Sequence, residues 1–218
     1  MNKDWSELNK AMQLQLKKKD TFDDGIVSLL ELRKQLWNTI LSYKKELKRE
    51  DFDSIPFINA EGYHSKTIAY SLWHVFRIED IVAHTLIQGD DQVLFAKKYQ
   101  ERTGSPIITT GNELVKEEIA DFSRQLDLDE LYSYMSDVKK STEKMLATLS
   151  FEDMKKKISD DRRRELESLG VVSEDERAIW LIDYWCKKDV RGLVQMPFSR
   201  HWIMHIEACE RIRRKIEA

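Results

Sequence analysis

The sequence predicts an all-α protein, and three observations support that prediction. The 218 residues include only 7 glycines and 3 prolines, so turns are few and elements are long. Charged residues make up 34% of the chain and include many Lys and Glu, which are good helix formers. Apolar residues recur at helical spacing through most of the length. A chain of this size suits one domain with a substantial core, so we predict a single helical-bundle domain over residues 1–218.

Residues 1–20 form a predicted N-terminal helical extension. Its apolar residues follow a short amphipathic pattern, which suits a helix packed on the main body or an arm that binds a partner: Trp5, Leu8, Met12 and Leu16. Asp23, Asp24 and Gly25 then resemble a helix start, because carboxylates near the first turn offset the helix dipole. Residues Ile26–Leu47 have apolar positions at helical spacing and predict the first long helix.

The second long helix is predicted from Ser65 or Lys66 to Ile87, with Gly89 as its stop. The segment before it, Asp53–Tyr63, contains a proline and a glycine and is expected to be a connection. His74 lies in the middle of this helix, one turn before an apolar position and one turn after Tyr70. Its side chain should therefore point to the edge of the apolar stripe.

The third long helix is predicted over Leu128–Leu149, after a loop at Gln100–Gly111 and a short helix at Asn112–Gln125. The seam of this third helix has a nearly strict heptad rhythm, which is typical of helices in a left-handed bundle. The seam residues are Leu128, Leu131, Met135, Val138, Thr142, Met145 and Leu149.

The segment Lys155–Gly192 is the least regular part and is interpreted as an insertion before the last helix. It is first highly charged and then aromatic, and it suggests two helical pieces, around Arg162–Ser168 and Glu174–Lys187. Pro197 suits a helix start, and Phe198–Ile216 is the predicted final helix. His205 occupies a position in the apolar seam of that helix.

Composition narrows the functional class. The net charge of −3 is nearly balanced, so neither nucleic acid nor a membrane is an expected partner, and the basic runs Lys155–Lys157 and Arg162–Arg164 are expected to be solvated or ion-paired. No apolar run approaches the ~18 residues of a membrane span. The N-terminus lacks the apolar stretch of a signal peptide. With only two cysteines in the chain, a cytoplasmic protein in a reducing environment is the expectation.

The histidines carry the main functional hypothesis. His201 and His205 are four residues apart, so both imidazoles lie on one helical face and can bind one divalent metal. The alternative is a half-buried pair that hydrogen-bonds to neighbouring helices. Two features favour the metal: a buried imidazole at the seam position of His205 needs partners, and His74 supplies a third histidine from another helix. Three histidines match an open site for Zn, Ni or Fe with a further position for water.

Other polar residues near these positions have more ordinary interpretations. His64 precedes the second long helix and suits a surface or capping role, whereas His84 is rotated away from His74 and is expected at the surface or core edge. Glu79 and Asp80 are expected on a solvated, salt-bridging face. The alternative for either carboxylate is to hold the tautomer of an imidazole.

The cysteines and two tryptophans are expected to be structural. Cys209 lies on the seam of the last helix, where a buried, inert thiol is expected, and Cys186 is expected in the core. Trp73 and Trp202 flank the histidines and are expected to be core residues, with a pocket wall as the alternative. No residue is singled out as catalytic.

Two stretches of the sequence resemble a known superfamily. The stretch Thr67-Ile-Ala-Tyr-Ser-Leu-Trp-His74-Val-Phe-Arg-Ile-Glu-Asp resembles helix 2 of the DinB-like (YfiT-like) superfamily, and Phe198-Ser-Arg-His201-Trp-Ile-Met-His205 resembles its last-helix HxxxH motif. The resemblance implies a four-helix bundle with up-down-down-up topology. It also implies a metal triad of His74, His201 and His205. This chain is longer than typical members, with the additional length at both the N-terminal extension and the insertion.

The resemblance also implies a chemistry. Members of that superfamily with assigned activity are mostly metal-dependent transferases or isomerases that use a low-molecular-weight thiol, such as bacillithiol, mycothiol or glutathione. A small thiol substrate and a homodimer are therefore expected here. The alternative is a non-enzymatic, stress-linked binding or dimerisation protein with vestigial histidines. Its interface would involve exposed Trp5 and Leu8, or the aromatic patch Trp180–Trp185.

Overall fold

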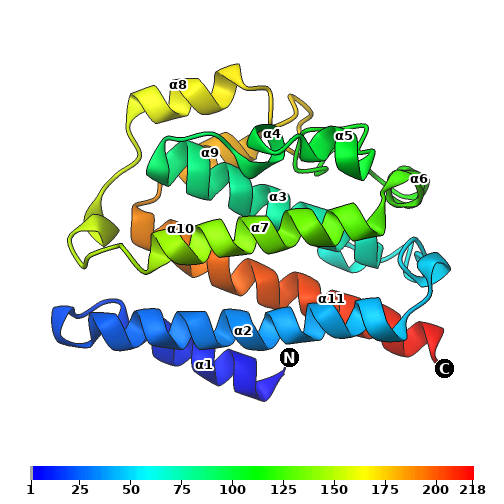
Figure 1. Ribbon diagram of the computed structural model, residues 1–218, viewed down its shortest axis with the longest axis horizontal. Helices are drawn as coiled ribbons and strands as arrows, with labels where there is room; N and C mark the ends of the chain where they lie inside the picture. The colour runs from blue at the N-terminus through cyan, green and yellow to red at the C-terminus, as the bar shows by residue number, and fades with distance from the viewer. Residues whose placement is uncertain (1) are drawn as a thin grey trace.

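The computed structural model describes residues 2–218 and confirms the all-α class. Its four long helices are α2 (Phe22–Glu46), α3 (Ile68–Asp80), α7 (Leu128–Leu146) and α11 (His201–Ile216). They lie side by side in Figure 1, where α2 and α11 run from left to right and α3 and α7 run the opposite way. Within the described residues there is no strand, only an isolated bridge between Lys157 and Asp189.

Two of these helices extend beyond their regular part through wider π-type turns. Helix α3 continues through Ile81–Gln88 and stops at Gly89, whose φ of 74° is available to glycine at little cost. At its start, the Thr67 hydroxyl accepts a hydrogen bond from the Tyr70 amide. The π-type turn Met196–Arg200 leads directly into α11. The predicted extent of the second long helix is therefore confirmed.

The predicted N-terminal helix is present as α1 (Lys3–Gln15), and it packs along α2 (Figure 1). Trp5 is 7% exposed and Met12 is fully buried. The close approach is possible because Gly25 has no side chain, since a Cβ there would lie 2.9 Å from the backbone nitrogen of Leu16. The expectation that Trp5 is exposed for a partner is therefore wrong, and Leu8 is itself partly buried against the core.

The connection between the second and third long helices contains more helix than the sequence suggests. Short helices α4 (Val93–Ala96) and α5 (Tyr99–Thr103) occur there, so the first part of the predicted loop at Gln100–Gly111 is helical. Helix α6 (Glu117–Gln125) begins five residues later than predicted, because the backbone at Lys116 has a φ of 48° and cannot continue a helix backwards.

The insertion forms three short helices: α8 (Asp160–Ser168), α9 (Trp180–Cys186) and α10 (Val190–Gln195). Helix α8 matches its prediction, whereas α9 occupies only the second half of the predicted Glu174–Lys187 piece. Apolar residues of the insertion belong to the same buried cluster as the end of α3, and they include Leu166, Val171, Val172, Ala178, Leu181, Ile182 and Trp185. The insertion is therefore part of the packed body.

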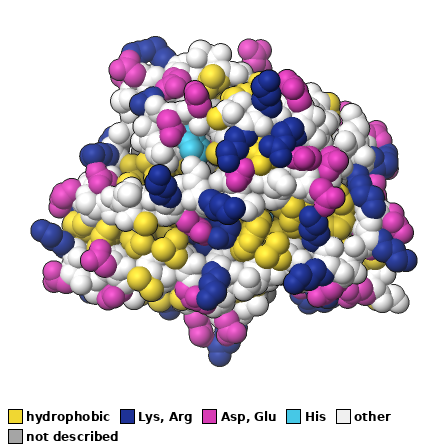
Figure 2. Space-filling model, viewed as in Figure 1, with side chains coloured by type: hydrophobic (Ala, Val, Ile, Leu, Met, Phe, Trp, Pro, Cys, Tyr) yellow, Lys and Arg dark blue, Asp and Glu magenta, His cyan; other side chains and the backbone are white. Residues whose placement is uncertain are grey.

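The surface carries both signs of charge. Figure 2 shows Lys and Arg interspersed with Asp and Glu over one whole face. The predicted basic runs are ion-paired: Arg163 contacts both Glu167 and Asp183, and Lys156 contacts Asp153.

None of the helices within residues 2–218 combines the length and the apolar character that crossing a membrane requires.

Candidate metal centre

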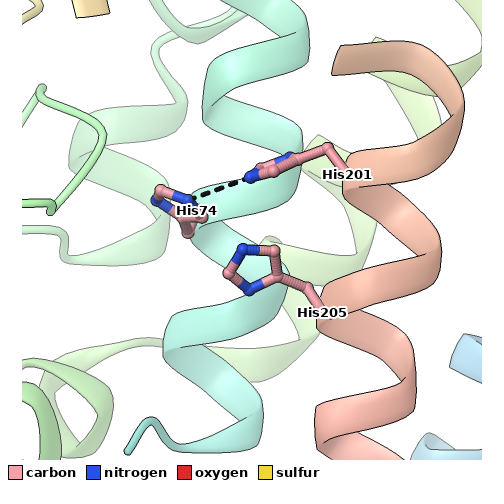
Figure 3. Close-up of side chains that lie close together, drawn as sticks. All are labelled: His74, His201 and His205. Atoms are coloured by element: carbon pink, nitrogen blue, oxygen red, sulfur yellow. Dashed lines mark hydrogen bonds between the residues drawn. The ribbon is translucent and has the colours of Figure 1, made fainter. Parts of the chain in front are cut away.

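Three buried histidines meet between α3 and α11. His74 comes from α3, and His201 and His205 come from successive turns of α11, so all three rings point into one space (Figure 3). Each side chain is 7% exposed or less. The candidate ligand atoms of the three residues all lie within 4.8 Å of one another. This is the set of histidines that the sequence analysis selected for a metal.

The orientation of His74 is fixed by a row of carbonyl groups. Along one face of α3, Tyr70, Trp73, His74 and Arg77 each donate a hydrogen bond to a backbone carbonyl in residues 108–111. Because a carbonyl can only accept, the 2.8 Å contact between His74 Nδ1 and the Thr110 oxygen places the proton on Nδ1. The lone pair of Nε2 then faces α11, where it accepts a hydrogen bond from His201 Nε2 (Figure 3).

The spacing of the nitrogens suits two ligands of one metal. His201 Nε2 lies 3.1 Å from His74 Nε2. Nitrogens bound at about 2.1 Å to one ion are separated by about 3.0 Å at an octahedral angle and about 3.4 Å at a tetrahedral angle, so this spacing falls between the two. A divalent ion of the imidazole-binding kind therefore fits the arrangement.

Two ring nitrogens of the cluster have no hydrogen-bond partner in the described part of the chain. The Nδ1 atoms of His201 and His205 are buried, and within residues 2–218 neither has a hydrogen-bond partner. Buried polar atoms are nearly always partnered, and exceptions call for a water, an ion or a functional explanation. In His201 the unpartnered Nδ1 is not the nitrogen that faces His74, so an ion bound at Nε2 would leave this atom without a partner.

The electrostatics keep the three rings neutral. Burial lowers the pKa of His74 to about 4, and the charge of Lys66 adds to that effect. Burial lowers the pKa values of His201 and His205 well below the usual range, and the neighbouring histidines lower them further. At neutral pH each imidazole therefore retains a lone pair, which is the form that binds a metal.

A buried ion pair lies beside the histidines. Arg33 of α2 contacts both carboxylate oxygens of Glu79, at 2.9 and 2.7 Å, and donates to the Phe198 carbonyl at 3.0 Å. Glu79 also accepts a hydrogen bond from the indole of Trp202 at 2.7 Å. These contacts join α2, α3 and the start of α11, and thereby fix the position of His201. Trp202 is completely buried, as predicted for a core residue.

The expectation of a solvated face at Glu79 and Asp80 is wrong, because both carboxylates are fully buried. Asp80 accepts hydrogen bonds from the amides of Val93 and Leu94 and from the Tyr134 hydroxyl. Neither carboxylate is hydrogen-bonded to a histidine of the triad in the described chain. The carbonyl of Thr110 has the role that the sequence analysis considered for these two side chains.

The other two histidines lie outside the cluster. His84 is 3% exposed, not at the surface, and its Nδ1 lies 2.6 Å from Asp90 Oδ1. His84 is buried because this helix is covered on all sides, with every residue of Ile68–Asp80 and the first six residues of Ile81–Gln88 buried. His64 is half-buried in the turn before α3 and packs against Tyr63, with ring centroids 4.1 Å apart and planes tilted by 40°.

Neither cysteine has the surroundings of a nucleophile. Cys209 is fully buried, and burial raises the pKa of its thiol to about 12, so the predicted inert role is supported. Cys186 is half-buried at the edge of the core beside Trp185, and burial raises the pKa of its thiol as well. A reactive thiol at this centre would therefore have to come from a bound molecule.

A cavity of about 610 Å³ opens next to the histidines. Its lining is mainly apolar and aromatic, and all three histidines contribute to it. Helix α9 and the residues before it supply one wall, and that wall includes Arg177, Trp180, Leu181, Tyr184 and Trp185. The insertion therefore has a defined role in the structure, because it closes one side of the space that faces the candidate metal centre.

Three features of this site could not be predicted from the sequence. The carbonyl of Thr110 lies in a predicted loop, and no side-chain pattern marks a backbone acceptor. Lys66 lines the cavity but was noted only as a helix start. The aromatic residues of α9 were considered only for a protein interface, although Trp185 is 1% exposed. In the sequence, only the amphipathic spacing of these aromatic residues could have indicated that one side of α9 faces the protein.

The comparisons with known proteins do not assign this chain to a family. No protein-family model matches this chain, and no curated protein gives a significant match. The DinB-like resemblance therefore stays a prediction, and function has to be inferred from the site itself.

Proposed function

We propose that this chain is a divalent-metal-dependent enzyme of the DinB-like type that transfers or isomerises groups with a low-molecular-weight thiol. One observation carries the proposal: three buried, neutral histidines converge on one point at the wall of a cavity large enough for a small molecule. Three protein ligands with one open position are the arrangement of catalytic rather than structural metal sites.

The chemistry follows from the donor set and the pocket. A divalent metal held by His74, His201 and His205 would act as a Lewis acid and lower the pKa of a thiol bound at the open position. His74 is held in the required tautomer by Thr110, and the apolar walls reduce the water that surrounds the reacting sulfur. In a transfer, the sulfur attacks an electrophilic carbon, the new S–C bond forms, and the leaving group departs with its electron pair.

Metal binding is the first test. The purified protein is stripped with a chelator, dialysed and titrated with Zn²⁺ or Ni²⁺ by calorimetry. We expect one ion per chain and at least a hundredfold weaker binding in His74→Ala, His201→Ala and His205→Ala. His64→Ala is the matched control, since His64 lies near the site but outside the cluster. Unchanged affinity in the three variants would refute the metal centre.

Thiol binding is the second test. The protein is loaded with Co²⁺, and bacillithiol, mycothiol or glutathione is added. A thiol that binds the metal gives a sulfur-to-cobalt charge-transfer band, which the His205→Ala variant should lack. Consumption of the thiol with an electrophile such as 1-chloro-2,4-dinitrobenzene then reports turnover. A loaded protein that shows neither the band nor metal-dependent turnover with any of the three thiols would exclude the enzymatic function.

One observation favours the alternative of a binding or dimerisation protein. Ile179 and Trp180 are adjacent apolar residues that remain 41% and 49% exposed at the insertion. Under this alternative the pair forms a homodimer interface and the histidines are vestigial. Sedimentation of Trp180→Ser against the unmodified protein tests it. A dimer that this substitution dissociates, in a protein that binds no metal, would favour the alternative.

A further inference from the structure

The cavity beside the histidines has two chemically different parts. Most of its lining consists of the imidazoles and of apolar and aromatic side chains, such as Leu181 and Trp185. Two cationic side chains, Lys66 and Arg177, also line it, and no Asp or Glu does. A molecule that fills the cavity therefore meets positive charge without a balancing carboxylate in the lining.

Lys66 is placed close to the metal centre. Its ammonium group lies 4.9 Å from the ring centroid of Tyr70. That ring in turn stacks on the imidazole of His74, with centroids 5.5 Å apart and planes 11° from parallel. One aromatic ring thus separates the ammonium group from a candidate metal ligand. A ligand of modest size can reach both at once.

The two cations differ in how they are partnered. Arg177 donates two hydrogen bonds of 2.8 Å to Asp175, one to each carboxylate oxygen, so its charge is largely balanced. No carboxylate within residues 2–218 forms an ion pair with Lys66, which is half-buried. Burial and the charge of Arg177 lower the pKa of Lys66 to about 8, so it is still mostly protonated at neutral pH. Buried or partly buried charges normally have a partner, and here it is missing.

We propose that the cavity binds a small molecule with an apolar or aromatic body and a carboxylate, and that Lys66 is the group that recognises the carboxylate. This deepens the proposed function, on which it rests, by naming the substrate class of the same site. The ammonium group contacts the carboxylate at one end, and the wall supplied by α9 contacts the apolar body. The other end of the molecule then faces the three histidines.

The test uses metal-free protein, so that a carboxylate cannot bind through a metal. The probes are 4-phenylbutanoate and its neutral isostere 4-phenylbutanamide, each titrated by calorimetry and by tryptophan fluorescence. We expect the carboxylate to bind at least tenfold more tightly than the amide, with a preference that falls as salt is added. In Lys66→Met, which keeps the apolar stem, the preference should disappear while the amide binds as before.

Controls separate this effect from general charge and from misfolding. Lys10→Met removes an exposed lysine from α1, which does not line the cavity, and should leave the preference intact. Lys66→Gln serves as a second variant if Lys66→Met does not give the thermal unfolding profile of the unmodified protein. Equal affinity for the two probes, no binding of either, or a preference that survives in the Lys66 variants would overturn the inference.

The carboxylate-binding test and the metal-binding test can fail separately. A carboxylate preference in a protein that binds no Zn²⁺ or Ni²⁺ would leave the anion site standing and refute the metal-dependent function. One bound metal per chain with no carboxylate preference would leave the metal centre standing and refute the carboxylate site at Lys66.

Discussion

Two buried polar clusters lie next to each other on α3 and α11, and they differ in how they are satisfied. In the first, Arg33, Glu79 and Trp202 exchange hydrogen bonds of 2.7 to 2.9 Å, and opposite charges compensate each other. In the second, protonation would make each of the three histidines positive, so no opposite charges compensate. The Nδ1 atoms of His201 and His205 have no hydrogen-bond partner within residues 2–218. The first cluster is closed by protein, whereas the second adjoins a cavity.

This difference separates a structural polar cluster from a binding site. A satisfied buried network fixes how the helices pack, and burial is tolerated because each charge has a partner. Burial alone would lower the pKa of Arg33, but the charge and hydrogen bonds of Glu79 and Glu143 raise it overall. No comparable group compensates the histidines, so their pKa values fall.

The largest expected effect is the pH dependence of the metal-free protein. Folded-state pKa values below the unfolded value of about 6.5 mean that the unfolded chain binds more protons, so stability falls as pH decreases through that range. His74, with a folded pKa of about 4, alone accounts for a loss of about 3 kcal/mol, and His201 and His205 act in the same direction. Urea unfolding between about pH 7 and pH 4 measures it.

The comparison variant for that experiment is the double substitution His201→Leu with His205→Leu. It removes two of the three suppressed protonations, so the stability should depend less steeply on pH. An unmodified protein whose stability is flat down to about pH 5 would show that the histidines ionise freely in the folded state.

The next largest effect is expected from breaking the satisfied cluster. Glu79→Gln keeps the shape of the side chain but removes the charge that compensates Arg33, and should cost about 3–5 kcal/mol. Glu143→Gln is the matched control, because Glu143 contacts Arg33 at 3.3 Å from a partly exposed position and should cost much less. Urea unfolding at neutral pH measures both. Equal losses in the two variants would contradict the assigned importance of Glu79.

The smallest effect on stability is expected at the unsatisfied cluster. His205→Leu replaces a buried side chain that lacks a partner with an apolar one, so the metal-free protein should change by less than about 1 kcal/mol or become more stable. Metal should nevertheless stabilise only the unmodified protein, by about 2.7 kcal/mol at a hundred times the dissociation constant. Unfolding with and without Zn²⁺ gives both quantities. A loss of several kcal/mol without metal would make His205 a structural residue.

Much of this arrangement could be predicted from the sequence, because helical periodicity is a local property. The spacing of apolar residues located the long helices to within a few positions, and Gly89 marked the end of the second one. The same periodicity placed His201 and His205 on one face and His74 at the edge of a stripe. In the structure the candidate ligand atoms of these three histidines lie within 4.8 Å of one another.

Local periodicity failed where packing between distant segments decides the outcome. Glu79 was assigned to a solvated face, yet Arg33, 46 residues earlier, pairs with it in the core. His84 was predicted at the surface or core edge, but neighbouring segments, α8 among them, cover all sides of the helix at this point. The exposure expected for Trp5 failed for a similar reason, since α1 packs it against the rest of the chain.

The sequence alone thus determined which elements are helical and that His201 and His205 share one face, because both follow from spacing along single helices. The packing of α3 against α11 brings His74 to the other two. Only the tertiary structure decided the tautomer of His74, the wall formed by the insertion and the position of Lys66 near the histidines. Each of these depends on groups far apart in the chain, and one of them, the Thr110 carbonyl, is a backbone atom that every residue type provides. Sequence patterns record side chains, whereas a binding site is completed by whatever atoms folding brings to its surface.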